Sequence, residues 1–220
     1  MPKSYPISLQ VENRLCLVVG GGAVAERKVQ SLLECGALLR LISPEITPGI
    51  RRLINTGKIE YTQGRYSREH LRGVFLVVGA TDCEKTNQQI STDSNEMGLL
   101  FNIVDDPSRC NFYVPAVVKR GSLQIAVSTD GKSPLLARKI REQLEPLFPD
   151  EFEDVVNLLG DLRQKIIQVS AEPHEKKALL NSLLDHEVME LLRKGKFDQA
   201  KERIQNAYLG GGSKPQDCTR

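Results

Sequence analysis

Three consecutive glycines, residues 20–22, form the first group whose spacing could support chemistry. They directly follow the apolar run Leu15–Val19, and a helix-compatible segment begins right after them. Gly20, Gly22 and Ala25 fit the G-x-G-x-x-G/A pattern, in which the first glycine permits a tight turn and the second lets the backbone approach a pyrophosphate. The free N–H groups at the start of the following helix favour an anion. The spacing therefore predicts a dinucleotide site, with contacts expected from Gly20, Gly22, Ala23 and Val24.

The residues after the next predicted strand, 38–42, decide which dinucleotide fits. In dinucleotide-binding folds, a carboxylate at this position binds the adenosine ribose of NAD, whereas a nearby arginine accommodates the 2′-phosphate of NADP. The chain has Ser43, Pro44 and Glu45 here, with Arg40 on the strand before them. Glu45 either reaches the ribose or only solvates a loop. Because this segment has no basic pair for a phosphate, NAD is the predicted cofactor.

Two later strands are expected to bring further polar residues to the same edge of the sheet. Thr81 and Asp82 come after the apolar run 74–78, Asn102 lies on the strand 99–104, and Asp105 follows that strand. Ligands of open α/β sheets bind at the carboxyl ends of the strands. Thr81 and Asn102 are therefore predicted to line the cofactor site. Asp82 either lines it too or caps the next helix.

Asp105 is the predicted catalytic base. A carboxylate that is partly buried in a cleft has a raised pKa, which suits proton transfer. The alternative is a structural role, in which Asp105 or Asp106 caps the turn before Pro107.

Alternating strand and helix patterns predict an α/β fold with a Rossmann-like parallel sheet that positions these groups. Residues 7–9 are a possible first strand, and residues 59–62 an edge strand. Helices are expected over residues 46–55 and over residues 84–96, the second ending at Gly98. After residue 106 the pattern changes to an antiparallel hairpin, with strands 111–118 and 123–128 and a turn at 119–122. Ser133-Pro134 then predicts a helix start. Amphipathic helix follows, with breaks near Pro173 and Gly195.

These patterns divide the chain into four parts. A dinucleotide-binding domain is expected over residues 1–110, a hairpin and helix over 111–148, a helical domain over 149–209 and a flexible tail over 210–220. The hairpin and the apolar faces of the later helices exceed what one small sheet can cover, so a homodimer is predicted.

Composition restricts the class of protein. The 220 residues are 40% hydrophobic and 26% charged, and the net charge of +2 is too small to argue for a nucleic-acid partner. No apolar run has the length of a membrane span, and the first residues lack a signal-peptide core. The five cysteines are scattered without paired spacing, which predicts reduced thiols, a cytoplasmic location and no metal site.

Four motifs in order resemble a known family: residues 18–28, 80–82, 102–107 and 125–138. Together they closely resemble precorrin-2 dehydrogenase, the amino-terminal module of siroheme synthase. The resemblance runs from about Ile7 to Phe148 and continues more loosely beyond. The methyltransferase half of larger siroheme synthases is absent, so the stand-alone form is expected.

The resemblance implies a reaction and a substrate. Precorrin-2, a tetrapyrrole rich in carboxylates, would pass a hydride to NAD and lose a proton, giving sirohydrochlorin for siroheme or cobalamin. Some members also insert ferrous iron, and the residues fit activity with or without that step. Asp105 would then accept the proton, and Lys132, Ser133 and Arg138 would meet substrate carboxylates, with Lys119 and Arg120 as further candidates. Each cation alone is also compatible with an ordinary surface charge.

A different class of function fits the glycine motif as well. Rossmann domains with appended helices also serve as regulatory modules that sense a nucleotide and perform no chemistry. That reading expects an acidic residue in the ribose slot and has no need of Asp105. Ser43 and the hairpin argue against it.

Overall fold

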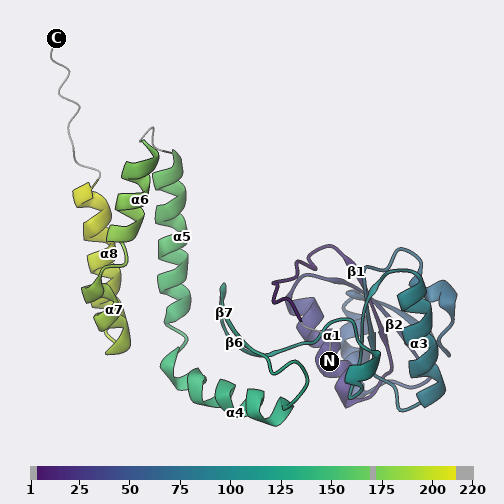
Figure 1. Cartoon of the computed structure of the whole chain (residues 1–220). Helices are drawn as coiled ribbons and strands as arrows, with labels where there is room; N and C mark the ends of the chain where they lie inside the picture. The colour runs from purple at the N-terminus through teal and green to yellow at the C-terminus, as the bar shows by residue number, and fades with distance from the viewer. Residues whose placement is uncertain (1–3, 169–171, 212–220) are drawn as a thin grey trace. The chain divides into compact units, whose positions relative to one another are not determined.

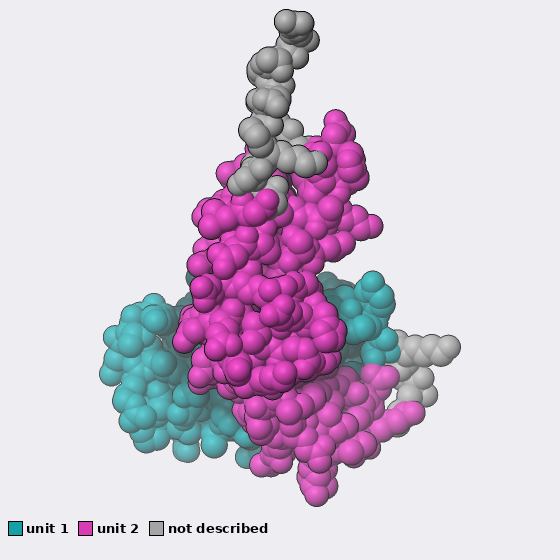
Figure 2. All heavy atoms as spheres, turned by 90° about the vertical axis from the view of Figure 1, so that its left-hand side faces the viewer, with its two compact units in different colours: residues 1–114 teal, residues 115–220 magenta. Residues whose placement is uncertain are grey.

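The computed structural model describes residues 4–168 and 172–211 and separates into two compact units, residues 1–114 and 115–220 (Figure 2). Each unit has apolar core residues of its own. The first unit contains two buried clusters and the helices of the second unit enclose a third.

The first unit is a five-stranded parallel sheet with the strand order β3-β2-β1-β4-β5. Figure 1 labels β1 and β2 of this sheet together with two helices of the unit, α1 and α3. Its strands are β1 (Leu15–Val19), β2 (Leu38–Ser43), β3 (Ile59–Gln63), β4 (Leu76–Gly79) and β5 (Leu100–Ile103). Its helices are α1 (Ala23–Glu34), α2 (Pro48–Asn55) and α3 (Glu84–Glu96), with the short 3₁₀ turns η1 (Arg68–Leu71) and η2 (Pro107–Arg109). The predicted Rossmann-like sheet is confirmed, and β3 lies at its edge as expected.

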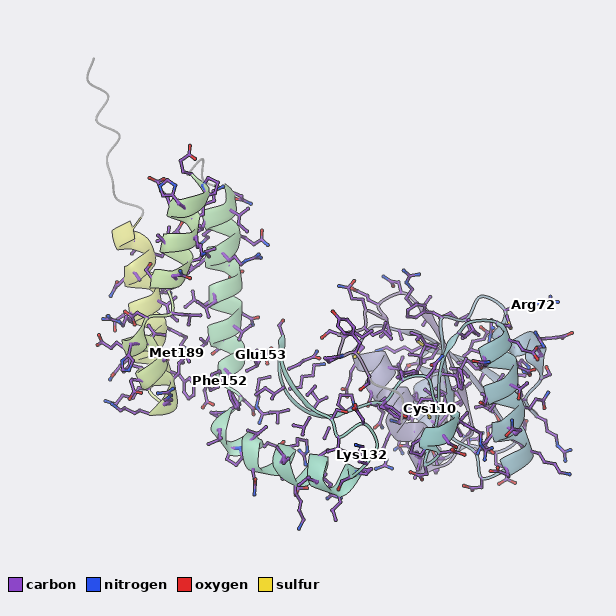
Figure 3. All side chains as sticks on the ribbon, viewed as in Figure 1. Arg72, Cys110, Lys132, Phe152, Glu153 and Met189 are labelled. Atoms are coloured by element: carbon purple, nitrogen blue, oxygen red, sulfur yellow. The ribbon has the colours of Figure 1, made fainter. Side chains whose placement is uncertain are left out.

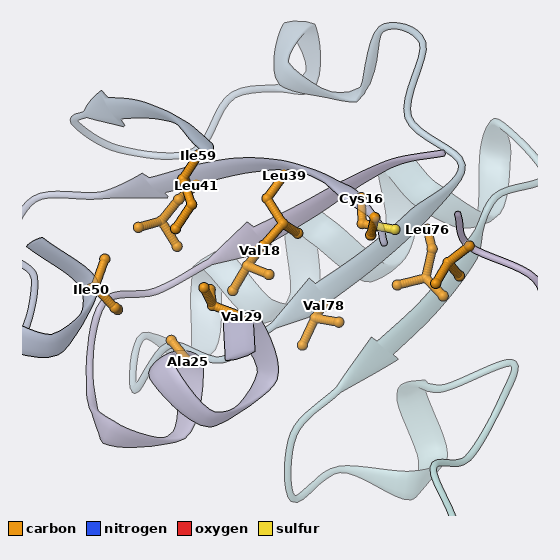
Figure 4. Packing of buried hydrophobic residues seen from close by; sticks show 12 residues of the cluster. Cys16, Val18, Ala25, Val29, Leu39, Leu41, Ile50, Ile59, Leu76 and Val78 are labelled. Carbon is orange, nitrogen blue, oxygen red and sulfur yellow. The ribbon is translucent and has the colours of Figure 1, made fainter. Parts of the chain in front are cut away.

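Both faces of the sheet are buried, which explains its continuous apolar strands. On one face, Ala25 and Val29 of α1 pack in the same cluster as Val18 and Val78 (Figure 4). The second cluster contains Leu17, Val77 and Ile90 of α3, among others. Because successive strand residues point to opposite faces, β1 contributes to both clusters.

The structure corrects three details of the sequence prediction. Residues 7–9 form no strand. The helix expected from Ile46 begins at Pro48, because the side chain of Thr47 caps it by accepting a hydrogen bond from the N–H of Ile50 at 3.2 Å. The strand expected from residue 111 begins only at Ala116.

The late start of that strand has a local cause at Asn111. Its backbone N–H donates to the carbonyl of Phe101 at 3.1 Å, and its side-chain oxygen accepts from the N–H of Phe101 at 2.8 Å. The side-chain amide also donates to the carbonyl of Leu99 at 2.7 Å. Asn111 therefore covers part of the open edge of β5, which would otherwise present unpaired backbone groups.

The second unit begins with the predicted antiparallel hairpin of β6 (Ala116–Arg120) and β7 (Leu123–Val127). A tight turn at Gly121 joins the strands, and its φ of 54° is one that glycine adopts without strain. The helix α4 (Pro134–Leu144) follows, with Ser133 as its N-cap, and then the turn η3 (Glu145–Leu147). The predicted helix start at Ser133-Pro134 is confirmed.

Four further helices complete the described chain: α5 (Phe152–Gln168), α6 (Pro173–Ser182), α7 (His186–Arg193) and α8 (Phe197–Gly211). Alongside the two predicted breaks, the structure has another before α7, where Asp185 accepts a hydrogen bond from the N–H of Val188 at 2.8 Å. The flexible tail predicted from residue 210 is wrong for residues 210–211, which belong to α8. Residues 212–220 of that tail lie outside the described residues. Within the described ranges, no helix is both long and apolar enough to span a membrane.

Candidate functional site

The three glycines between β1 and α1 have different physical roles. Gly20 has a φ of 122°, and a Cβ atom there would lie 2.0 Å from the carbonyl oxygen of Ala80. A Cβ atom at Gly21 would lie 1.9 Å from the carbonyl oxygen of Glu45. At Gly22, by contrast, a Cβ atom would meet nothing within 4 Å. The first two glycines are therefore required by the fold, and Gly22 alone borders open space.

The open position at Gly22 is also where α1 begins. Gly22 is its N-cap residue and supplies no side-chain oxygen, whereas Thr47 and Ser133 cap α2 and α4 with their hydroxyl groups. The first N–H groups of a helix have no partner within the helix and favour an anion. An exposed, uncapped helix start with no side chain in front of it is the kind of site that binds a pyrophosphate, and Gly22, Ala23 and Val24 supply its backbone N–H groups.

The loop between β2 and α2 is held by several hydrogen bonds. The buried Ser43 hydroxyl donates to the carbonyl of Glu45 at 2.6 Å, and Tyr61 donates its hydroxyl to the carbonyl of Ser43 at 3.0 Å. Gln63 donates its amide to the carbonyl of Pro44 at 3.1 Å. Ser43 thus stabilises its own loop. The Glu45 side chain is exposed, and its carboxylate has no hydrogen-bond or ion-pair partner within residues 4–168 and 172–211.

Arg40 is engaged elsewhere in the sheet. Its guanidinium forms an ion pair with Glu60 of β3 at 3.2 Å and donates to the carbonyls of His70 at 3.0 Å and Arg72 at 3.2 Å. These contacts occupy the one arginine that the sequence places on β2.

Thr81 lies in the turn after β4, and its side chain shapes that turn. Its hydroxyl oxygen accepts from the N–H of Cys83 at 3.1 Å, and its carbonyl accepts from the amide of Asn87 at 2.9 Å. The N-cap residue of α3 is Cys83. The expectation that Asp82 caps this helix is therefore wrong, and the Asp82 side chain is exposed beside the turn.

Asn102 and Asp105 differ in how far their side chains are buried. The half-buried amide of Asn102 donates to the carbonyl of Phe112 at 3.0 Å, which ties β5 to the chain that follows it. Asp105 is exposed and has a φ of 61°, a left-handed conformation that is uncommon outside glycine. The expected partial burial of Asp105 is thus wrong. Its backbone conformation is what sets it apart.

The neighbouring carboxylate, Asp106, takes the structural role in this turn. It is the N-cap residue of η2, accepts a hydrogen bond from the Ser108 hydroxyl at 2.5 Å and pairs with Arg109 at 2.7 Å. The hydrogen bond from Ser108 lowers the pKa of Asp106, and Arg109 contributes to the same shift. Asp106 is therefore the aspartate engaged in the turn before Pro107.

Lys28 is a residue near this site to which the sequence analysis gave no role. Burial lowers the pKa of this half-buried lysine, and the nearby charge of Asp105 acts in the opposite direction. Lys28 follows the buried Ala25 by three residues and so shares its side of α1. The sequence could have indicated this, because the three-residue spacing from Ala25 places the Lys28 ammonium group on the side of α1 that packs on the sheet.

The three residues predicted to meet the substrate belong to the second unit, which includes Lys132 (Figure 3). Lys132 is exposed. The Ser133 hydroxyl accepts from the N–H of Leu136 at 3.3 Å and so is engaged in starting α4. Arg138 is 71% exposed and pairs with Glu142 at 2.8 Å. The further candidate Arg120 is committed to Asp150 at 3.0 Å and to backbone carbonyls.

Among the described residues, no group of three or more His, Cys, Asp or Glu side chains is arranged to hold a metal ion. Cys16, Cys35, Cys83 and Cys110 are free thiols.

A parallel sheet with a glycine turn after its first strand and an uncapped helix start beyond it defines a Rossmann-type dinucleotide-binding protein. Residues 7–116 match the family model described as "Putative NAD(P)-binding", and residues 120–146 match "Sirohaem biosynthesis protein central". The chain belongs to this NAD(P)-binding family.

Curated relatives agree with the family resemblance found in the motifs. Siroheme synthase of Photorhabdus laumondii is 34% identical over 200 residues, which are 91% of this chain and 43% of the relative. Siroheme synthase 3 of Aeromonas hydrophila is 38% identical over 179 residues, 81% of this chain and 38% of the relative. The chain therefore spans less than half the length of these relatives.

A solved structure matches over a much larger share of its length. The structure of "SirC, precorrin-2 dehydrogenase" superposes with a TM-score of 0.75 at 27% identity, covering 92% of this chain and all of that chain. The fold prediction, including the hairpin and the helices after the sheet, is confirmed.

Proposed function

We propose that this protein is an NAD-dependent precorrin-2 dehydrogenase that forms sirohydrochlorin in tetrapyrrole biosynthesis. The observation that carries the proposal is the full-length match to a precorrin-2 dehydrogenase structure in a chain whose glycine turn is open at Gly22. The relatives named siroheme synthase support the same substrate class.

The chain's own residues have distinct roles in this proposal. When bound, NAD supplies the hydride acceptor. Backbone N–H groups of residues 22–24 would hold its pyrophosphate and Glu45 would face its ribose, while Thr81 and Asn102 would stabilise the turn and strand beside it. Loss of a hydride from one carbon of the substrate must be accompanied by loss of a proton, and we assign that proton to the carboxylate of Asp105.

Two features of Asp105 support this assignment. It lies two residues after the end of β5, and so at the carboxyl edge of the sheet together with the glycine turn. Its left-handed φ of 61° is a conformation that costs energy for a residue other than glycine. Asp106 already stabilises the turn before Pro107, so that structural role does not require Asp105.

NAD, and not NADP, is the proposed cofactor. The unpaired carboxylate of Glu45 would repel a 2′-phosphate, and Arg40 is occupied by Glu60 and two carbonyls. The exposed free thiols of Cys35 and Cys83 fit a reducing compartment, so a cytoplasmic location is part of the proposal.

Substrate carboxylates are proposed to bind Lys132 and Arg138. Both are exposed, and the long side chain of Arg138 can exchange its surface partner Glu142 for a substrate group at little cost. Ser133 contributes by starting α4, which carries Arg138, and Arg120 is excluded by its contacts with Asp150.

A homodimer is proposed for the second unit. A two-stranded hairpin is marginally stable alone and has two unpaired edges. Several large apolar side chains of the hairpin, α4 and η3 are exposed, namely Val117, Leu135, Leu136 and Leu147. A second copy of the chain would cover them. Analytical ultracentrifugation should therefore give twice the chain mass at micromolar concentration, and a monomer there would contradict the dimer.

The deciding experiment mixes purified protein with precorrin-2 under anaerobic conditions and follows the absorbance of sirohydrochlorin and reduced cofactor. We expect turnover with NAD and much slower turnover with NADP. Equal rates would show that Glu45 does not discriminate. Binding of NAD without any oxidation of precorrin-2 would instead favour the regulatory module. Ferrous iron added to the product mixture tests iron insertion, with siroheme formation above the uncatalysed rate as the positive result.

A further inference from the structure

The glycine turn, residues 20–22, and the β2–α2 loop, residues 43–47, touch directly. They are the loops expected to hold the pyrophosphate and the ribose of the cofactor. The N–H of Thr47 donates to the carbonyl of Gly21 at 3.0 Å. The α-carbon of Gly21 packs so closely on the β2–α2 loop that a Cβ atom would overlap Glu45 O at 1.9 Å and the Ser43 hydroxyl at 2.7 Å. The position of one loop therefore depends on the position of the other.

Glu26 joins the two loops by a further contact. It belongs to the first turn of α1, and its carboxylate accepts a hydrogen bond from the Thr47 hydroxyl at 2.5 Å. Thr47 is the N-cap of α2. The Glu26 carboxylate thus lies at the start of α2, where the helix dipole favours a negative charge.

Gly49 provides the space that this carboxylate occupies. A Cβ atom at Gly49 would lie 1.8 Å from one Glu26 carboxylate oxygen and 2.6 Å from the other. Gly49 is buried in the first turn of α2, and its backbone does not need a positive φ. The glycine is therefore explained by the Glu26 side chain and not by the path of the backbone.

We propose that Glu26 is a positioning residue for the cofactor site, which fixes the loop 43–47 relative to the glycine turn through Thr47. The proposal rests on the NAD-binding function proposed above. It concerns the geometry of the ribose loop and assigns Glu26 no contact with the cofactor. A direct effect of its charge would have the opposite sign, because a carboxylate beside an anion site repels a pyrophosphate.

Three variants separate positioning from charge. Glu26→Ala removes the anchor and should weaken NAD binding about tenfold, the effect of losing one hydrogen bond to a charged group. Glu26→Gln loses the charge but keeps an oxygen that accepts from Thr47, so it should retain most of the affinity. Gly49→Ala should displace the Glu26 carboxylate and weaken NAD binding to a similar extent as Glu26→Ala. It does so although Glu26 and Thr47, the two residues of the hydrogen bond, are both unchanged.

The double variant provides the sharpest control. In a Glu26→Ala background the space beside Gly49 is vacant, so adding Gly49→Ala should cause no further loss of affinity. Gly160→Ala is the matched substitution elsewhere, because Gly160 lies within α5 and a Cβ atom there meets nothing within 4 Å. It should leave NAD binding unchanged.

Calorimetry of the full chain measures the affinities, and hydrogen exchange of residues 43–47 without cofactor measures the loop itself. Faster exchange in this loop is expected for Glu26→Ala and Gly49→Ala, with a raised KM for NAD and an unchanged kcat at saturating NAD. Equal or tighter NAD binding by Glu26→Ala, or unchanged exchange, would overturn the proposal.

The outcomes also separate this inference from the proposed function. If Gly22→Val weakens NAD binding while Glu26→Ala leaves it intact, the cofactor site stands and the role of Glu26 is wrong. If the wild-type protein binds no NAD, the proposed function fails, and unchanged exchange in the loop would reject the anchor as well.

Discussion

The two units of this chain place their polar groups in contrasting ways. At the carboxyl edge of the first unit, loop residues are fixed by short hydrogen bonds, as Ser43 is to Glu45 and Thr47 to Glu26. In the second unit, the cations proposed to meet the substrate are exposed, and Arg138 forms a surface ion pair with Glu142. The edge proposed to hold the cofactor is thus fixed by contacts within the first unit, whereas the proposed substrate contacts come from exposed side chains that can adapt.

The comparison predicts the largest effect for Asp105, the residue at the fixed edge that is proposed to do chemistry. Asp105→Asn keeps the shape and the tolerance of a left-handed backbone but removes the base. Turnover should fall roughly a hundredfold to ten-thousandfold, because general-base help is lost. Single-turnover absorbance measures this. Asp106→Asn is the matched control, and it should affect stability more than rate because Asp106 pairs with Arg109.

NAD affinity and dimer mass should stay unchanged in Asp105→Asn, since neither depends on that charge in this proposal. If the protein also inserts iron with the same base, both activities should fall together. Retained dehydrogenation in a folded Asp105→Asn protein would show that the proton leaves by another route.

Next in size is the effect of the glycine turn, where neighbouring residues separate binding from folding. Gly22→Val places a side chain in open space, so the protein should fold normally and lose NAD affinity roughly tenfold to a hundredfold. Gly21→Ala places a Cβ atom 1.9 Å from Glu45 O and should instead lower the melting temperature. Calorimetry and thermal unfolding of both variants test the distinction. Unchanged NAD affinity in folded Gly22→Val would remove the turn from the cofactor site.

A smaller effect is expected for Lys132 in the second unit. Lys132→Ala should raise the KM for precorrin-2 roughly fivefold to tenfold, by loss of a charge-assisted hydrogen bond, and leave the KM for NAD unchanged. Added salt should reduce the difference from wild type, because exposed charges are screened. Lys139→Ala on α4 is the matched control. Equal effects of the two substitutions would indicate a general charge effect and no specific contact.

Local patterns were sufficient to predict most of the fold. The span of α3 and the start of α4 followed from apolar spacing, a terminal glycine and the Ser133-Pro134 pair. The site was less predictable, because its arrangement depends on contacts between distant residues. Sequence spacing could not indicate that Asn111 would occupy the edge of β5, or that Gly49 would leave room for Glu26. Nor could it indicate that Asp105 would be exposed while Asp106 bonds to Ser108.

The smallest expected effect concerns the helical part of the second unit and should leave catalysis untouched. Asp185 caps α7 and pairs with Arg203 of α8 at 2.6 Å. Asp185→Ala should destabilise these helices by about 1 kcal/mol, a typical cost of losing an N-cap. Hydrogen exchange of α7 and α8 in the full chain measures it. Asp198→Ala is the matched control, because Asp198 is almost fully exposed and pairs only with Lys201 among the described residues, so its loss should cost little.

The effect of Asp185 should also depend on pH. The hydrogen bond from Arg203 holds the pKa of the Asp185 carboxyl below its ordinary value, and the bond from the N–H of Val188 acts in the same direction. A carboxyl with a lowered folded-state pKa contributes stability above its unfolded pKa of about 3.9 and loses that contribution as the pH falls through the folded value. The difference in hydrogen-exchange protection of α7 and α8 between wild type and Asp185→Ala should therefore be largest at neutral pH and decrease below about pH 4. A gap that stayed constant into strong acid would assign the effect to the shape of the cap and not to its charge.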